Sequence, residues 1–148
     1  IALIPHSSCF VKKELATNPI INRLVTSIFI TNDVDLEGLK TKSKEVFDLG
    51  FNLIIFPSGI RHHKNEYPKI KKGASLVALN ASKDIIPIKL FADGDFLFIN
   101  KPFYDGDEKT VNFEVKVCEE INLSDFIAES EIITKKNITK QITNELYS

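Results

Sequence analysis

The stretch that decides the fold prediction is Asn52-Leu53-Ile54-Ile55-Phe56-Pro57-Ser58-Gly59-Ile60-Arg61-His62-His63. Its apolar first half is typical of a buried strand, and its Pro and Gly residues predict a sharp turn at the strand's end. In a parallel sheet, ligands bind at the carboxyl ends of strands. Arg61 follows the turn directly, and a guanidinium presents a planar fork of donors that matches phosphate oxygens. We therefore expect a phosphate-like anion beside Arg61, supported by Lys64, Lys69, Lys71 and Lys72.

Length and composition limit the possible classes of protein. The 148 residues fit one domain with a core, with 43% apolar and 26% charged residues. A formal net charge of -1 gives no overall attraction to nucleic acid, so we expect no nucleic-acid partner. Cys9 and Cys118 are too few for a disulfide framework or a zinc site and are expected to be reduced thiols. The chain contains no Met and begins at Ile1, so we expect it to be incomplete at its N-terminus.

Before the decisive stretch, helices and strands are predicted to alternate. Residues 9–11 and 27–31 have the composition of short strands, and residues 19–26 have the spacing of a helix after Asn18-Pro19. A second helix is predicted from a cap at Asp35 to about Asp48, with Gly50 ending it.

After the stretch, the pattern first continues and then changes. Helical spacing covers residues 73–82, and residues 85–90 look like a strand whose proline favours an edge or a bulge. Residues 96–99 and 111–117 look extended, Ser124 is predicted to cap a helix over 125–133, and residues 134–148 predict an amphipathic helix. We therefore predict one α/β domain over residues 1–148, with a mostly parallel central sheet and flanking helices.

Common catalytic and phosphate-binding motifs are not matched. The turn lacks the Gly-x-Ser-x-Gly of a hydrolase elbow, so Ser58 is a poor nucleophile, and no segment has the P-loop pattern. His62 and His63 are interpreted as solvated or phosphate-assisting side chains, and His6 as a surface loop residue. The alternative for the whole turn is an ordinary strand-to-loop connection with a solvated basic loop.

Several blocks in collinear order resemble the glycerolipid acyltransferase family, which includes lysophosphatidic acid and glycerol-3-phosphate acyltransferases. Phe56-Pro57-Ser58-Gly59-Ile60-Arg61-His62 resembles the family's Phe-Pro-Glu-Gly-Thr-Arg-Ser, and Ile86-Pro87-Ile88 resembles its Val-Pro-Val. Between them, Lys71-Lys72-Gly73-Ala74 is similar to the family's Lys-Lys-Gly link. Thr26-Ser27-Ile28-Phe29-Ile30-Thr31-Asn32 resembles the block Gly-x-Ile-Phe-Ile-x-Arg, and Lys12-Lys13-Glu14-Leu15 resembles the segment before it. The resemblance covers roughly residues 9 to 90.

The chain departs from the family pattern at three points. The catalytic His-x-x-x-x-Asp block is absent, because Val11, Tyr67 and Pro68 stand where the Asp would follow His6, His62 and His63. Ser58 replaces the family's Glu, and Asn32 replaces an Arg that contacts phosphate. No catalytic residue is therefore assigned, and the block is expected upstream of Ile1 unless this is a non-catalytic relative.

The resemblance implies acyl transfer to a lysophospholipid or glycerophosphate in phospholipid synthesis. The donor would be a thioester co-substrate, acyl-CoA or acyl carrier protein, with no cofactor. Substrate-binding residues implied by the resemblance are Asn32, Phe56, Pro57, Ser58, Gly59, Ile60, Arg61, Lys72 and Pro87; Arg61 would hold the acceptor phosphate, and Pro87 would support the acyl or the acceptor pocket.

The same resemblance implies contact with the cytoplasmic face of a membrane, and a patch around Ile60, Tyr67 and Ile70 is a weak signal for it. The alternative function is a non-catalytic module of the acyltransferase type that binds a phospholipid or phosphate without turnover.

Overall fold

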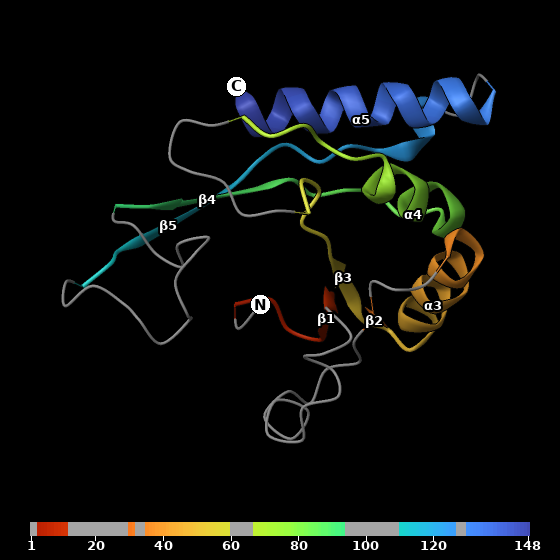
Figure 1. Cartoon of the computed structure of the whole chain (residues 1–148), viewed down its shortest axis with the longest axis horizontal. Helices are drawn as coiled ribbons and strands as arrows, with labels where there is room; N and C mark the ends of the chain where they lie inside the picture. Colours follow the sequence, from red (N-terminus) through yellow and green to blue (C-terminus); the bar gives the residue numbers. More distant parts are fainter. Residues whose placement is uncertain (1–2, 12–29, 32–34, 60–66, 94–109, 127–129) are drawn as a thin grey trace. The chain divides into compact units, whose positions relative to one another are not determined.

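The computed structural model describes residues 3–11, 30–31, 35–59, 67–93, 110–126 and 130–148 (Figure 1). The chain divides into two compact units. Unit 1 contains Ile1–Pro57 and Gly73–Lys83, and unit 2 contains Ser58–Lys72 and Asp84–Ser148. The predicted turn at Pro57-Ser58 therefore coincides with the passage of the chain from one unit to the other.

Unit 1 contains a sheet of three parallel strands in the order β2-β1-β3. The central strand β1 (Ser7–Val11) pairs with β2 (Ile30–Thr31) on one side and with β3 (Asn52–Ile54) on the other. The first three residues of β1, Ser7, Ser8 and Cys9, are all buried. A central strand of a parallel sheet is covered on both faces, and small side chains allow this close cover.

Helix α3 (Leu36–Asp48) begins and ends where the sequence predicts. The Asp35 carboxylate accepts a hydrogen bond of 2.8 Å from the Gly38 backbone N–H, which satisfies one of the unpaired donors of the first turn. At the other end, Gly50 has a φ of 79°, and its N–H donates to the Phe47 carbonyl. This left-handed ending is the arrangement for which glycine is favoured.

Helix α4 (Gly73–Ala81) packs against α3 within unit 1 (Figure 1). Leu76 and Val77 are buried, as their spacing predicts, whereas Leu79 is only partly covered. Val46 and Ser43 of α3 are also buried, and the Ser43 hydroxyl donates to the Leu39 carbonyl of its own helix. The two helices therefore contribute much of the buried side-chain surface of this unit.

Unit 2 contains an antiparallel ribbon of β4 (Ile88–Ala92) and β5 (Phe113–Val117). Strand β4 begins directly after Pro87, because proline has no N–H to donate to a neighbouring strand. The Pro87 carbonyl still accepts a hydrogen bond of 2.9 Å from the Cys118 N–H. Alternation along both strands places apolar side chains on one face of the ribbon. These are Ile88, Leu90, Ala92, Phe113, Val115 and Val117, with Leu90 62% and Val117 63% exposed.

The last part of unit 2 holds a short 3₁₀ helix, Leu123–Phe126, and the long helix α5 (Glu131–Tyr147). Ile138 and Ile142 of α5 are buried, which confirms the amphipathic terminal helix. The prediction of a helix over 125–133 capped by Ser124 is wrong. Ser124 lies inside the 3₁₀ helix, whose first N–H, that of Leu123, donates to the Asp84 carboxylate at 2.8 Å, and α5 begins only after Ser130.

The α/β prediction is confirmed in its coarse form, with helices and small sheets in both parallel and antiparallel arrangements. The described residues form a three-stranded parallel sheet and a two-stranded antiparallel one, so a large parallel central sheet stays a prediction. The predicted helix over 19–26 and strand over 96–99 lie outside the described residues. The same is true of residues 27–29 of the strand predicted over 27–31.

The two helix caps provide a matched test of local stability. Asp35→Ala removes a side-chain cap bond and should lower the free energy of unfolding by about 1 kcal/mol, measured by urea titration. Ser130→Ala is the control, because the Ser130 side chain makes no cap hydrogen bond to α5. A loss in the control variant as large as that in Asp35→Ala would contradict the assignment of the cap.

Candidate functional site

The turn after β3 is the first candidate region. Phe56 is 63% exposed, and Pro57 and Ser58 form a turn in which both are half-buried. The following residue, Gly59, is exposed and has a φ of 67°. An L-residue is strained in this left-handed conformation, so glycine allows the chain to leave the strand sharply at this point.

Lys71 lies beside this glycine within unit 2. A Cβ atom built onto Gly59 would lie 3.1 Å from the Lys71 Nζ and 3.7 Å from its Cε. The missing side chain therefore leaves room for an ammonium group close to the backbone of the turn. A cation next to an exposed turn backbone is suited to hold an anionic oxygen.

The other predicted site residues fall into two groups. Ile60, Arg61 and Asn32 lie outside the described residues, as do His62 and His63. Of the others, Lys72 lies in a groove described next, and Pro87 is buried beside the start of β4. The structure thus brings Gly59 together with Lys71, which the sequence indicated as a supporting charge and as part of the Lys-Lys-Gly link but not as a substrate-binding residue.

A second candidate region is an open groove of about 470 Å³ in unit 2. One wall is the segment from Tyr67 to Lys72, and the other is one face of α5. The described lining residues are Tyr67, Pro68, Lys69, Ile70, Lys72, Lys136, Thr139, Lys140, Thr143 and Tyr147. This volume lies in the range of sites that bind small molecules, roughly 300–1,000 Å³.

The spacing of residues on α5 explains why they share one wall. Lys136 and Lys140 are four residues apart, as are Thr139 and Thr143, so each pair lies on one side of the helix. Two hydroxyls in this stretch donate to carbonyls of their own helix, Thr139 to Lys135 and Thr143 to Thr139, each at 2.7 Å. The wall therefore combines cationic groups with hydroxyls whose protons point back into the helix.

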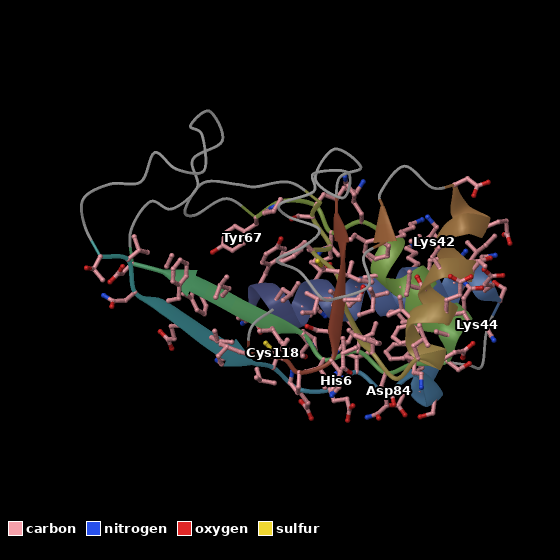
Figure 2. All side chains as sticks on the ribbon, turned by 90° about the horizontal axis from the view of Figure 1, so that it is seen from below. His6, Lys42, Lys44, Tyr67, Asp84 and Cys118 are labelled. Atoms are coloured by element: carbon pink, nitrogen blue, oxygen red, sulfur yellow. The ribbon has the colours of Figure 1, made fainter. Side chains whose placement is uncertain are left out.

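A tyrosine pair joins the two walls. The Tyr147 hydroxyl donates to the Pro68 carbonyl at 2.6 Å, and its ring meets the Tyr67 ring edge-to-face with centroids 5.2 Å apart. Tyr67 remains 73% exposed, and its side chain is labelled in Figure 2. Ile70, by contrast, is buried, so the expectation that it contacts a membrane interface is wrong, because its side chain belongs to the core of this unit.

Four lysines are among the described residues of the groove, although most of its exposed lining surface is apolar. Lys69, Lys72, Lys136 and Lys140 line it, and none of the described lining residues is acidic. The ion pairs within the described parts of the chain involve other lysines, namely Lys40, Lys44 and Lys135. Cations without a carboxylate partner attract anions in solution.

The thiols and His6 show no catalytic arrangement. Cys9 is buried, and burial raises the pKa of its thiol above the ordinary value of 9.0, which disfavours the reactive thiolate. The half-buried Cys118 donates through its Sγ to the Glu145 carbonyl at 3.6 Å. His6 is exposed in the bend before β1 and contacts the ring of Phe51, as expected for a surface loop residue. Residues of the described ranges contain no group of three or more His, Cys, Asp or Glu side chains able to hold a metal.

Comparison of the chain with protein-family models, curated proteins and solved structures found no match. Within the part of the chain that the structure describes, no helix is long and apolar enough to cross a membrane.

The α5 wall of the groove was not predicted from the sequence. The apolar spacing of Ile138, Ile142 and Leu146 indicates the terminal helix but not a role for its neighbouring face. The signal was present, since Lys136, Lys140, Thr143 and Tyr147 recur at helical spacing beside that apolar stripe. Of the two walls, only the segment from Tyr67 to Lys72 was indicated by the sequence, through its lysines.

Two glycines with positive φ allow a matched test of the turn. Gly59→Ala and Gly50→Ala should each lower the free energy of unfolding by about 1 kcal/mol, because both residues have left-handed backbones. Only Gly59→Ala places a Cβ against Lys71, since nothing lies within 4 Å of a Cβ at Gly50. Binding of inorganic phosphate, measured by calorimetry, should therefore weaken in Gly59→Ala alone, and equal weakening in both variants would contradict a local role for Lys71.

A second matched pair tests the link between the walls. Tyr147→Phe leaves the Pro68 carbonyl without its donor and should lower the free energy of unfolding by about 1 kcal/mol in urea titrations. Tyr67→Phe is the control, with an expected change within about 0.5 kcal/mol, because its hydroxyl makes no hydrogen bond that is seen in the described residues.

The same link should respond to pH. Burial raises the pKa of Tyr147 above its ordinary value of 10.0. As the pH rises, the unfolded chain therefore loses this proton first. The stabilisation from this hydrogen bond should be present below about pH 10 and should be lost at higher pH, so the free energy of unfolding should fall more steeply in wild type than in Tyr147→Phe; the buried Cys9 contributes the same decline to both.

Proposed function

We propose that this protein binds the phosphate of a lysophospholipid or glycerophosphate and takes part in acyl transfer to its free hydroxyl in phospholipid synthesis. The observation that carries the proposal is the Lys71 ammonium beside the left-handed Gly59, at the turn whose sequence resembles the family's acceptor-binding block. Arg61 follows that turn by two residues and is proposed to complete the clamp on the phosphate. The planar guanidinium of Arg61 and the compact ammonium group of Lys71 would then bind the same phosphomonoester.

The reaction assigns separate tasks to separate groups. The acceptor hydroxyl attacks the thioester carbonyl, a new ester bond forms, the carbon–sulfur bond breaks, and the thiol of the donor leaves with the proton. The donor is acyl-CoA or acyl carrier protein. Orientation of the acceptor is one contribution to such a reaction, and a positioned general base is another. The residues of this chain support the first contribution, because none of its histidines has the family's Asp spacing.

Contact with a membrane is part of the same proposal, since the acceptor is a lipid. The support comes from the apolar face of the β4–β5 ribbon, on which Leu90 and Val117 are more than half exposed. Insertion of such a face into the interfacial region of a bilayer is favourable by about 25 cal/mol per Å² of apolar surface removed from water. We propose the cytoplasmic face of the membrane as the location.

A second candidate is a module that binds the phospholipid headgroup without turnover. It is favoured by two specific departures, Ser58 in place of the family's Glu and Asn32 in place of its Arg. Both candidates need the phosphate clamp and differ only in whether product forms.

The test compares two lipids and two arginine variants. Lysophosphatidate should bind more tightly than the monoacylglycerol with the same acyl chain, because only the first carries a phosphate. Arg61→Gln should weaken lysophosphatidate binding roughly tenfold or more, as expected for loss of a charged hydrogen bond. Arg23→Gln is the control, since it removes the chain's other guanidinium from a stretch outside the acceptor-binding block.

Product analysis separates the two candidates. The assay uses protein that includes the sequence encoded upstream of Ile1, where the His-x-x-x-x-Asp block is expected. Formation of phosphatidate from lysophosphatidate and acyl-CoA or acyl carrier protein then supports acyl transfer, and tight binding without product supports the binding module. Equal affinity for the two lipids, or equal effects of the two arginine variants, would reject the phosphate clamp and both candidates with it.

A further inference from the structure

The groove between the Tyr67–Lys72 segment and α5 is elongated. The two walls run side by side within unit 2, with Tyr67 in contact with Tyr147 at one end (Figure 1). At the rise of an extended chain, the Tyr67–Lys72 wall is roughly 16 Å long. At the rise of an α-helix, the stretch of α5 from Lys136 to Tyr147 is also roughly 16 Å long. An open groove of this shape suits a chain-like ligand better than a compact one.

The exposed lining of the groove is mostly apolar, and an aromatic pair marks one end. The Tyr67 ring is 73% exposed, yet it is held by the edge-to-face contact with Tyr147, whose hydroxyl is bonded to the Pro68 carbonyl. A ring that is already fixed loses little side-chain freedom when a partner covers it. Tyrosines are frequent anchors of protein interfaces, so this end suits a bulky apolar side chain.

Exposed positive charge surrounds the apolar lining. Lys69 and Lys72 lie on one wall, Lys136 and Lys140 lie on the other, and all four residues are exposed. None of the four forms an ion pair with a described residue. Their ammonium groups need not enter the groove, because charges around an apolar centre select and steer a partner from the edge of an interface. The surface therefore complements a partner that is acidic around an apolar anchor.

The Tyr67–Lys72 wall also presents backbone groups that a polypeptide can bind. Tyr67, Lys69 and Ile70 form no backbone–backbone hydrogen bond with any other described residue. The carbonyl of Pro68 accepts its hydrogen bond from a side chain, that of Tyr147. An extended peptide supplies N–H and C=O groups along its whole length, as in the addition of a strand to an exposed edge. The acyl chain of a lipid has no such groups.

We propose that this groove binds an extended, acidic segment of a partner protein. A bulky apolar side chain of the segment lies against the tyrosine pair, and its carboxylates lie beside the exposed lysines. The site uses other residues than the Gly59 turn, and the proposal does not rest on acyl transfer. A bilayer fits less well, because the site is concave and the Ile70 side chain is buried rather than presented to lipid.

The experiment measures the fluorescence anisotropy of labelled peptides titrated with the full 148-residue chain. The probe is Glu-Leu-Glu-Phe-Glu-Leu-Glu, which combines both required features. Three comparison peptides each change one feature: Lys replaces Glu, Ser replaces Leu and Phe, or the amides of Leu and Phe are N-methylated. We expect the probe to bind at least about tenfold more tightly than each comparison peptide, since each lacks charge, apolar contact or backbone donors.

A pair of double variants tests the charge. Lys136→Gln/Lys140→Gln should weaken binding of the probe at least about tenfold, because it removes the cations of the α5 wall. The control is Lys89→Gln/Lys116→Gln, which removes the same charge from the ribbon of the same unit and should leave the affinity within about twofold of wild type.

A pair of single variants tests the aromatic end. Tyr67→Ala should weaken binding of the probe about tenfold, as expected for loss of an interface anchor. Phe91→Ala is the control, because it removes a ring that is 51% exposed on the ribbon. Both substitutions are at exposed positions, and far-UV circular dichroism verifies that each variant is folded.

Four outcomes would overturn the site. The wild-type chain might fail to bind the probe, or it could bind the serine or N-methylated peptide equally well. Equal losses in a variant and its control would show attraction that is not specific to the groove. Binding of phosphatidylserine vesicles that depends on Lys136 and Lys140, without binding of the probe, would show that this face contacts lipid instead.

Discussion

The segment from Tyr67 to Lys72 is held by a hydrogen bond to α5 and by the burial of Ile70, and the candidate sites depend on this constraint. On one side the Lys71 ammonium lies against the space left by Gly59. On the other, the Pro68 carbonyl accepts the Tyr147 hydroxyl of α5, and Ile70 is buried between these contacts. A short extended segment has no internal hydrogen bonds to define its shape, so its position comes from what it packs against.

This arrangement distributes neighbouring lysines to different tasks. Lys71 faces the turn, whereas Lys69 and Lys72 line the groove. A run of basic residues that looks in sequence like a single solvated patch therefore contributes side chains to two different regions. The two regions differ in chemistry. The turn presents the exposed backbone of Gly59 and the ammonium group of Lys71, whereas the groove also contains tyrosine rings and threonine hydroxyls.

The ends of the helices and strands around these regions are set mostly by residues near them in the sequence. Helix α3 begins at an Asx cap and ends at a left-handed glycine, and β4 begins where a proline can no longer join the ladder. The ribbon that follows is less usual, because one of its faces is apolar and exposed. Exposed apolar surface of this kind commonly marks a site of interaction, which is consistent with the proposed contact with lipid.

The sequence by itself determined the elements whose signals are local. Asp35, Gly50 and Pro87 each act on the backbone within a few residues, and the spacing of Ile138 and Ile142 identifies a buried helical face without knowledge of its partner. The sharp turn at Gly59 was predictable for the same reason, since only glycine adopts its φ without strain. The residues flanking the turn were named as a site from their pattern.

Only the tertiary structure decided which distant residues meet. Three features join segments far apart in the chain: the strand order β2-β1-β3, the hydrogen bond from Leu123 to Asp84, and the groove lined by Lys69 and Lys140. Local propensity carries no information on such pairings, because their free energy appears only when both segments are already in place. The cations were visible in the sequence, but their division between a turn and a groove was a property of packing.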